Sequence, residues 1–227
     1  RLVERYDLHE KQIIEIGCGD GEFLRLLCET GRNRGVGFDP SFVSDGSDVD
    51  GVERVTIIKD FYSEQYVDTR ADFICCRHVL EHIDHPRRFV QSVRRAIGDR
   101  SDTPVYFEVP NVLYTLKKLG IWDLIYEHCS YFSPSSLERL FTSCGFIVND
   151  LQETYAGQFL SVEALPNQER SSPTTSKAFT NGPNAEEMAR DAEAFAERYR
   201  SKVRRWRGNL EKMRSATQHA VIWGAGS

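Results

Sequence analysis

The 227-residue sequence lacks several features that mark specialised classes of protein. No run approaches the roughly 20 consecutive apolar residues that a membrane-spanning helix needs. The amino-terminal stretch RLVERYDLHEK has no apolar segment of the kind found in a secretory signal peptide. These absences predict a soluble, cytoplasmic protein that does not bind a membrane.

Paired cysteines and an excess of positive charge are also missing. The six cysteines form no Cys-x-x-Cys pair, and several lie in apolar runs, where buried free thiols are common. We therefore expect reduced thiols and no cysteine-built zinc site. With 29 Lys and Arg against 34 Asp and Glu, the net charge is −5, which gives no general attraction to a nucleic acid. No nucleic-acid partner is expected.

What the sequence does contain is the pattern of an α/β domain. Up to about residue 165, short apolar or β-branched runs alternate with helical patterns, the order that builds a parallel sheet covered by helices. Two later runs, FIVNDLQETY and QFLSVEAL, are too close together for a helical crossover and should pair antiparallel. We predict a doubly wound, seven-stranded sheet that ends in this hairpin. The five predicted parallel strands are Gln12–Ile16, Gly35–Asp39, Val55–Ile58, Asp72–Cys76 and Val105–Val109.

The remainder of the chain reads as a linker and a long helix. Residues 166–183 are rich in Pro, Ser, Thr and Asn without periodicity, as linkers are, so the first domain is expected to span residues 1–165. In residues 184–227 apolar side chains recur at three- and four-residue steps and mark one face of an amphipathic helix. They are Met188, Ala192, Phe195, Tyr199, Val203, Trp206, Leu210 and Met213.

The mixed composition of this apolar stripe favours packing against the rest of the protein over a free coiled coil. Self-association through the helix is the alternative. The final residues, HAVIWGAGS, are typical of the first strand and turn of a truncated α/β unit, or of an irregular tail.

The stretch EIGCGDGEFL places Gly17, Gly19 and Gly21 directly after the first predicted strand. Glycines let backbone amides approach a ligand, and the helix that follows offers its positive end. Glu22 stands where the dinucleotide fingerprint G-x-G-x-x-G needs a glycine, and its charge disfavours a pyrophosphate. No Gly-Lys-Ser/Thr of a P-loop follows. The loop favours a nucleoside without phosphates, although a merely structural turn would also use three glycines.

In GVGFDPS, Asp39 ends the second predicted strand roughly 20 residues after the glycine loop. A carboxylate at this place accepts the hydroxyls of a ribose in dinucleotide folds. The combination with the glycine loop resembles the class I S-adenosylmethionine-dependent methyltransferases, which have a Rossmann-like fold, over about residues 10–165. This resemblance implies S-adenosylmethionine as the cofactor, with Asp39 and its neighbour Pro40 at the ribose.

The same resemblance implies roles for the other residues at the ends of the strands. The three glycines would line the methionine and ribose, and Glu15 would support their loop. Asp60 would bind the adenine amino group with Phe61 beside the ring, and Arg77 and His78 would face the sulfonium. The alternative for Asp60 is that it is an acidic residue in a loop with no role in binding.

Two stretches contain residues that could bind a metal ion, but neither has the spacing of a known metal site. In DFICCRHVLEHIDHP, Glu81, His82 and His85 have no second ligand pair in view, so residues at the start of a helix are the better interpretation. DGSDVDG lacks the glutamate that a calcium loop carries at its twelfth position. No metal is expected.

The stretch YEHCSYFSPSSLERLFTSCGF follows the fifth strand. Ser133 and Ser135 can each cap a helix that begins near Pro134. Glu127 and His128 precede it among four aromatic residues, which can desolvate both groups enough to tune proton transfer. The four are Trp122, Tyr126, Tyr131 and Phe132.

This stretch is similar to the Glu-His-x-x-Tyr-Phe-Ser segment of the sugar C-methyltransferases, which methylate nucleotide-linked keto-deoxysugars. The resemblance implies that His128 removes a proton next to a ketone, while Glu127 orients it or stabilises the developing charge. Ile125 stands where that family often has a tyrosine. The family's cysteine-rich zinc module and most of its carboxyl-terminal domain are missing, so we expect an excised domain or a relative with another acceptor.

Three other functions stay open at this stage. The first is O- or N-methylation of another small molecule with the same cofactor. The second is a cofactor-binding assembly module without catalysis, in which the long helix docks a partner. The third, a nicotinamide oxidoreductase, is disfavoured by Glu22.

Overall fold

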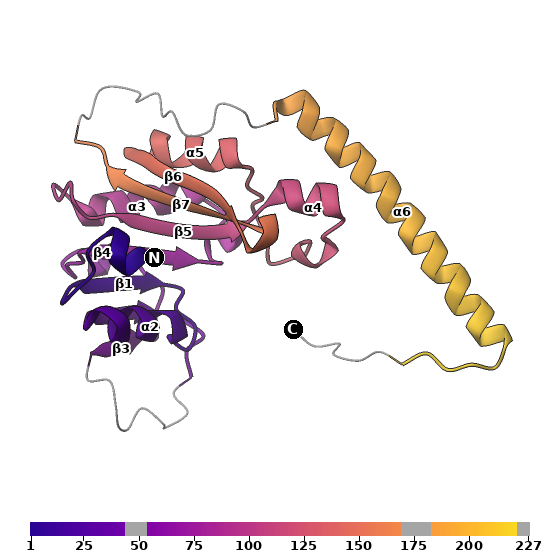
Figure 1. The fold of residues 1–227 in the computed structure, drawn as a ribbon, viewed down its shortest axis with the longest axis horizontal. Helices are drawn as coiled ribbons and strands as arrows, with labels where there is room; N and C mark the ends of the chain where they lie inside the picture. Colours follow the sequence, from indigo (N-terminus) through magenta and orange to yellow (C-terminus); the bar gives the residue numbers. More distant parts are fainter. Residues whose placement is uncertain (44–53, 169–182, 222–227) are drawn as a thin grey trace.

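The computed structural model describes residues 1–43, 54–168 and 183–221. Figure 1 shows one twisted sheet with helices packed on it. The seven strands lie in the order β3-β2-β1-β4-β5-β7-β6. Neighbours from β3 to β5 are parallel, and β7 pairs antiparallel with both β5 and β6. The bounds are β1 Gln12–Ile16, β2 Arg34–Phe38, β3 Val55–Ile58, β4 Phe73–Arg77, β5 Val105–Pro110, β6 Phe146–Thr154 and β7 Phe159–Pro166.

The predicted sheet and its terminal hairpin are therefore confirmed, and each predicted parallel strand lies within one residue of its observed bounds. The α-helices are α1 Leu2–Arg5, α2 Glu22–Gly31, α3 Pro86–Ile97, α4 Val112–Lys118, α5 Pro134–Ser143 and α6 Ala185–Ser215. Short 3₁₀ turns are η1 Glu64–Tyr66, η2 Leu80–His82, η3 Ile121–Asp123 and η4 Tyr155–Gly157.

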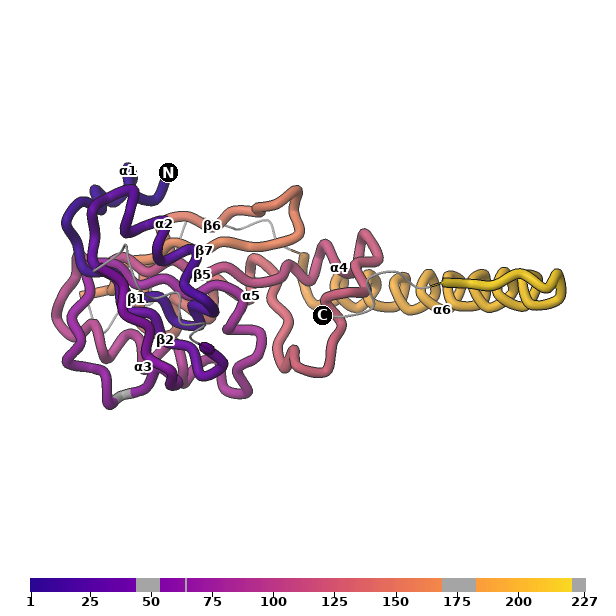
Figure 2. Tube along the Cα trace, turned by 90° about the horizontal axis from the view of Figure 1, so that it is seen from below, coloured from indigo at the N-terminus to yellow at the C-terminus, as the bar shows by residue number. Residues whose placement is uncertain are grey.

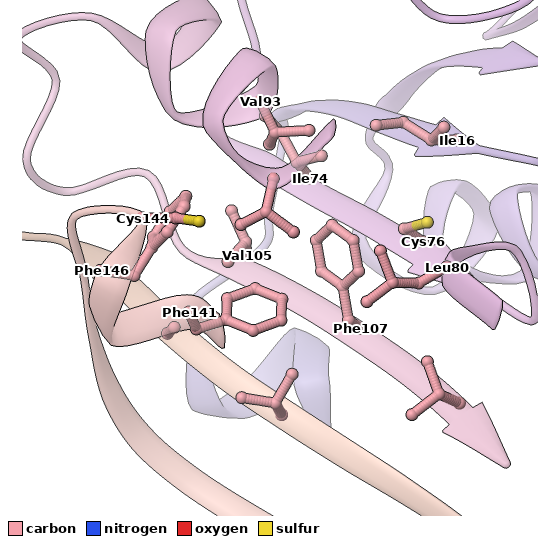
Figure 3. Close-up of a cluster of buried hydrophobic side chains, with 14 of the residues drawn as sticks. Ile16, Ile74, Cys76, Leu80, Val93, Val105, Phe107, Phe141, Cys144 and Phe146 are labelled. Carbon is pink, nitrogen blue, oxygen red and sulfur yellow. The ribbon is translucent and has the colours of Figure 1, made fainter. Parts of the chain in front are cut away.

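Two hydrophobic clusters cover the two faces of the sheet, because neighbouring residues in a strand point to opposite faces. On β1, Ile14 and Ile16 join the larger cluster with α3 and α5, whereas Ile13 joins the smaller cluster with α1 and α2. Figure 3 shows the larger cluster, in which the rings of Phe107 and Phe141 meet edge to face with centroids 5.0 Å apart. Burying such side chains stabilises the fold by about 2–3 kcal/mol each.

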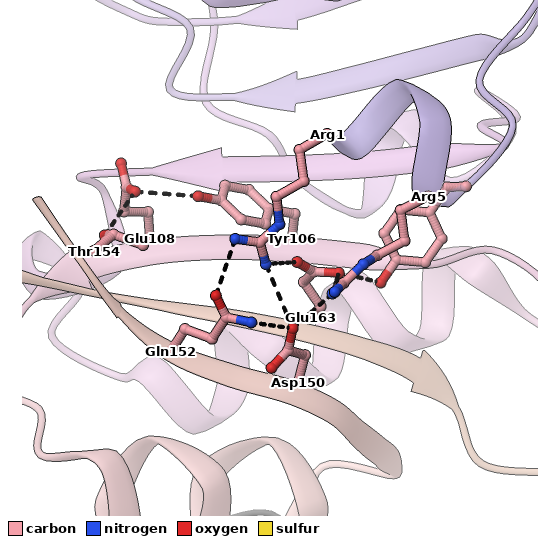
Figure 4. Close-up of polar contacts among 9 residues, drawn as sticks. Arg1, Arg5, Tyr106, Glu108, Asp150, Gln152, Thr154 and Glu163 are labelled. Atoms are coloured by element: carbon pink, nitrogen blue, oxygen red, sulfur yellow. Dashed lines mark hydrogen bonds and ion pairs between the residues drawn. The ribbon is translucent and has the colours of Figure 1, made fainter.

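The amino-terminal segment is held to the hairpin by a polar network (Figure 4). Glu163 lies on β7 on the side away from the larger cluster and is only 1% exposed. A buried carboxylate needs charged or hydrogen-bonding partners. Arg1 and Arg5 each place a guanidinium nitrogen within 3.0 Å of it, and the Tyr6 hydroxyl donates to it at 2.5 Å. The network ties the chain's first turn to the far edge of the sheet.

The long helix is confirmed, but the expected burial of its apolar stripe is not. Helix α6 leaves the body of the protein as a rod (Figures 1 and 2), and none of its residues is buried. It rests on α4, where the Arg198 guanidinium donates to the carbonyls of Leu116 and Lys117. Tyr199 and Trp206 are 42% and 54% exposed. A straight helix can follow a curved globular surface only over a few turns, so the rest of the stripe faces solvent.

Several expectations fall on residues that the structure does not describe. Most of the predicted linker, the DGSDVDG turn and nearly all of the terminal VIWGAGS segment lie outside the described ranges. Within those ranges, no helix combines the length and the apolar character that crossing a bilayer requires.

Candidate functional site

A cleft of about 800 Å³ opens at the carboxyl ends of β1 and β4. The strands β2 and β3 extend the sheet from one side of β1, and β4 and β5 extend it from the other. Open α/β sheets bind ligands at this kind of switch point, because the loops after the two central strands diverge to opposite faces. Twelve residues line the cleft: Glu15, Gly17, Cys18, Gly19, Asp20, Glu22, Phe23, Arg25, Leu26, Glu29, Arg77 and His78.

The three glycines of the loop have different local reasons to be glycine. All have positive φ, at 70°, 56° and 83° for Gly17, Gly19 and Gly21, a conformation that other L-residues rarely adopt. A Cβ on Gly17 would collide with Val79, and one on Gly21 would come within 2.8 Å of Ile57, whereas nothing lies within 4 Å of a Cβ on Gly19. Gly19 therefore leaves the most open space beside the cleft. Gly21 caps α2 and is not among the lining residues.

Glu15 places a buried carboxyl group at the floor of the cleft. Its residue is 2% exposed, and its Oε2 atom has no hydrogen-bond partner. Burial raises the pKa of the Glu15 carboxyl from 4.5 to about 8, although the positive charge of Arg77 acts in the opposite direction. An unpaired buried oxygen is costly. A ligand group that donates a hydrogen bond at this place would remove that cost.

Asp39 lies at the end of β2 and reaches across to the glycine loop. Its Oδ2 accepts from the Gly19 amide at 2.8 Å, and its Oδ1 accepts from the Ser41 amide and hydroxyl at 2.8 and 2.6 Å. A carboxylate has about four lone-pair positions, so both oxygens can still accept from a ligand. Although desolvation opposes it, these hydrogen bonds hold the pKa of Asp39 below its usual value.

Asp60 and Phe61 follow β3 on the other side of Asp39. The Asp60 carboxylate accepts from the Tyr66 hydroxyl at 2.7 Å and from the Phe61 amide at 2.8 Å. These bonds lower the pKa of Asp60. Phe61 is 70% exposed, so its ring is accessible to a ligand. Neither residue lines the cleft beside Glu15, and the same holds for the exposed Pro40 and for Asp39, which reaches the cleft only through its bond to the Gly19 amide.

At the end of β4, Arg77 and His78 share one buried carboxylate. Glu108 Oε1 on β5 lies 3.2 Å from Arg77 Nε and 3.3 Å from His78 Nε2. Hydrogen bonds to Glu108 and Glu81 raise the pKa of His78 to about 9, while the pKa of Glu108 falls to about 2 despite its burial, mainly through His78 and Arg77. Sequence reasoning missed Glu108, because its place opposite Arg77 follows only from the β4–β5 register.

The loop after η3 brings His128 to the turn that follows β4. The amides of Cys129 and Ser130 both donate to the Glu81 carbonyl, at 2.8 and 3.0 Å. The His128 ring lies edge to face against His82 with centroids 4.8 Å apart. Further along, Ser133 caps α5 in a capping box with Ser136, as predicted for Ser133. The predicted candidates His128 and His78 are thus carried by adjacent segments at one edge of the sheet.

The tautomer of His128 is fixed by its backbone partner. Its Nδ1 lies 2.8 Å from the Asp123 carbonyl oxygen. A carbonyl oxygen only accepts, so Nδ1 carries the proton and Nε2 has a free lone pair in the neutral ring. His82 repeats this arrangement, with Nδ1 3.0 Å from the Glu127 carbonyl oxygen.

The side chain of Glu127 is exposed, and its carboxylate is hydrogen-bonded to Tyr126. The carboxyl groups near His128 include those of Glu81 and Asp123, and the sequence did not single out either of them as a partner of His128. Ligand atoms of Glu81, His82 and His128 all lie within 4.8 Å of one another. His85, by contrast, is the N-cap residue of α3, in agreement with its interpretation as a helix-start residue.

These residues fit the chemistry of S-adenosylmethionine. Its amino and ribose hydroxyl groups are hydrogen-bond donors, and the unpartnered Glu15 oxygen and the Asp39 carboxylate are acceptors that could receive them. Its carboxylate needs a cation, a role for which Arg77 and His78 have the right charge. The open space over Gly19 admits a close approach to the backbone.

Known proteins resemble this chain in sequence and in fold. The methyltransferase domain model matches residues 1–151. The C-methyltransferase NovU of Streptomyces niveus is 33% identical over 156 residues, which are 66% of this chain and 36% of that protein. The chain therefore spans about a third of the length of the curated relative it matches.

Solved structures share the fold at low sequence identity. Magnesium protoporphyrin IX methyltransferase ChlM from Synechocystis PCC 6803, with bound SAH, superposes with a TM-score of 0.57 at 16% identity and covers 73% of this chain and 78% of its own. The N,N-8-amino-8-demethyl-D-riboflavin dimethyltransferase RosA from Streptomyces davawensis gives 0.56 at 19% identity over 71% and 51%.

Proposed function

This chain belongs to the methyltransferase domain family as an S-adenosylmethionine-dependent enzyme, and we propose that it methylates a carbon atom next to the carbonyl group of a small molecule. The acceptor that we propose is a nucleotide-linked keto-sugar. The likeness to a C-methyltransferase over 66% of the chain supports this choice of atom. When bound, the cofactor supplies an electrophilic methyl group.

In this proposal the cofactor lies in the cleft between β1 and β4. Asp39 accepts the ribose hydroxyls, Glu15 receives a donor group of the methionine portion, and Arg77 with His78 binds its carboxylate. Gly19 leaves room for the backbone to approach, while Gly17 and Gly21 hold the shape of the loop. Asp60 and Phe61, at the end of β3, contact the adenine.

The observation that carries the proposed reaction is the fixed tautomer of His128. Because its Nδ1–H donates to the Asp123 carbonyl, Nε2 is left as a base in a half-buried site. His128 Nε2 takes the proton from the carbon next to the ketone, and the electron pair of that C–H bond moves into the enolate. With the cofactor bound, the enolate carbon would take its methyl group, and the electron pair of the broken methyl–sulfur bond would stay on the sulfur of S-adenosylhomocysteine as the leaving group. A base fixed in this way contributes roughly 10²- to 10⁴-fold to such a step.

Glu127 acts on this base through its peptide group, whose carbonyl accepts from His82 and so fixes the ring beside His128. The role of its exposed carboxylate stays a prediction. A hydroxyl or amine acceptor would need alignment with the methyl group more than a base for a carbon acid. A held histidine base therefore favours carbon as the methylated atom.

Replacement of His128 by Ala tests the proposal. With a nucleotide-linked keto-deoxyhexose in D₂O, we expect the unmodified protein to exchange the hydrogen next to the ketone when S-adenosylhomocysteine is bound. In His128→Ala this exchange and the methyl transfer should both fall at least 100-fold, because the base is lost.

The matched control is His85→Ala, which removes an exposed histidine from a nearby turn and should leave both rates unchanged. Calorimetry should give the same S-adenosylhomocysteine affinity for all three proteins. Persistent exchange in His128→Ala would remove this residue as the base. An unmodified protein that neither exchanges nor methylates this ketone would contradict the sugar acceptor.

A further inference from the structure

The three side chains that meet beside the proposed base have the composition of a metal site. Glu81, His82 and His128 come from two segments more than 40 residues apart in the sequence, and they offer one carboxylate oxygen and two ring nitrogens within 4.8 Å of one another. Two histidines and one carboxylate form a common ligand set for a zinc ion that keeps an open position. The sequence did not reveal this set, because His128 is remote from the other two.

Glu81 provides a second, independent indication of a missing partner. The residue is 2% exposed, and its Oε2 has no hydrogen-bond partner. Its other oxygen lies 3.7 Å from His78 Nδ1. A buried carboxylate oxygen without a partner is costly, and a bound cation at this point would offset that cost.

Both histidines are already oriented as metal ligands are. Metal-binding histidines commonly donate their second N–H to a carbonyl or a carboxylate, which fixes the ring and leaves the other nitrogen free. Here the Nδ1 atoms of His82 and His128 lie 3.0 and 2.8 Å from backbone carbonyl oxygens. The Nε2 lone pair of each ring is left for a ligand.

The two segments are also tied together by their backbones. Two amides of the His128 loop donate to the Glu81 carbonyl at 2.8 and 3.0 Å, so the ligands do not depend on long, independent loops for their positions. Ligand atoms around a tetrahedral zinc lie roughly 3.4 Å apart. The separations here are within 4.8 Å, so shifts of roughly an ångström among the three side chains would bring their ligand atoms to that spacing.

We propose that Glu81, His82 and His128 bind a divalent ion of the zinc class. Two imidazoles favour Zn²⁺, Co²⁺ or Ni²⁺ over Mg²⁺ or Ca²⁺, which prefer oxygen ligands. A metal on His128 Nε2 occupies the lone pair that removes the proton, so zinc inhibits methyl transfer. The inhibition rests on the proposed function of His128, but the binding site does not.

Metal titration of the full chain tests the site without any need for turnover. Zn²⁺ measured by calorimetry and Co²⁺ measured by its visible absorption should each bind with a stoichiometry of one. We expect His82→Ala and Glu81→Gln to weaken Zn²⁺ binding by tenfold or more. The control His85→Ala should leave it unchanged.

Cys129 needs its own control, because it is the exposed one of the six cysteines and its sulfur lies 3.6 Å from the His82 carbonyl oxygen. Cys129→Ser should retain Zn²⁺ binding to within threefold. The proposal is overturned if the unmodified chain binds no zinc, if His82→Ala weakens binding by less than tenfold, or if Cys129→Ser abolishes it.

Where the chain turns over a ketone, Zn²⁺ should inhibit the unmodified enzyme, and a chelator should restore its rate. Zinc that binds at this site without inhibiting would contradict the role of His128 as base and leave the metal site standing. If the unmodified chain binds no zinc but His128→Ala still abolishes hydrogen exchange, the metal site alone is contradicted and the proposed base stands.

Discussion

Glu15 shows how one buried carboxyl group makes the stability of this fold depend on pH. Glu15 points to the face of β1 that carries the smaller hydrophobic cluster, whereas its neighbours Ile14 and Ile16 point to the larger cluster on the opposite face. Its Oε2 atom has no hydrogen-bond partner in the described part of the chain. Burial raises its pKa to about 8. A folded-state pKa above the unfolded value of 4.5 means that the folded chain holds this proton over the interval between them.

Protein stability should therefore depend on pH through Glu15. As pH rises from about 4.5 to 8, the Glu15 carboxyl ionises readily in the unfolded chain but not in the folded one, because burial opposes its charge. Over this range Glu15 therefore lowers the free energy of unfolding by on the order of 3 kcal/mol. The free energy of unfolding of Glu15→Gln, measured by chemical denaturation across this pH range, should not show that decrease. Other titrating groups are present in both proteins, so their contributions cancel when the two profiles are subtracted. Parallel pH profiles for the two proteins would contradict the burial argument.

At the residue scale, the sequence predicted which residues belong to the candidate site better than it predicted what each of them contacts. It predicted the three glycines as a group, yet Gly19 leaves open space, whereas Gly17 packs against Val79. That difference depends on the turn after β4, which the sequence does not place beside β1. Glu108 and Glu81 were missed as partners for the same reason, since strand pairing and the docking of a remote loop bring them to the site.

At the scale of elements, the parallel strands were predictable because buried strands have continuous apolar runs bounded by glycine and polar residues. Helix α6 was predictable as a helix, because its apolar residues have helical spacing and Asn184 caps it with Glu187. Its packing was not predictable. Periodicity shows that a helix has an apolar face, but it does not show what covers that face.

Changes on α6 should leave the stability of the domain unchanged. In the triple variant Val203→Gln, Trp206→Gln and Leu210→Gln, the three side chains are already 38%, 54% and 47% exposed. Thermal unfolding of the full chain should shift by less than about 2 °C.

The contrasting change is Leu137→Ala on α5, at a residue with 0% exposure. It should cost about 2–5 kcal/mol and lower the melting temperature by several degrees. A triple variant that unfolds as early as Leu137→Ala would show that the α6 stripe is buried against the protein after all.

For the whole molecule, the order of the strands explains where chemistry occurs. The strands β2 and β3 lie on one side of β1 and the strands β4 and β5 on the other, and the cleft opens at this switch point between the parallel strands β1 and β4. The register of β4 with β5 sets Glu108 against Arg77 and His78. Docking of the His128 loop on the Glu81 carbonyl then carries the proposed base to the same edge. The proposed nucleoside site and the proposed base thus lie at the same edge of the sheet, an arrangement that would suit methyl transfer to a carbon acid.

The most direct test of this account is the binding of S-adenosylhomocysteine, measured by calorimetry. The unmodified chain should bind one molecule, and Asp39→Asn should bind it about 10- to 100-fold more weakly, because charge-assisted hydrogen bonds to the ribose are lost. Asp102→Asn, at an exposed turn before β5, should bind like the unmodified chain. Absence of binding, or equal affinity in Asp39→Asn, would contradict the placement of the cofactor.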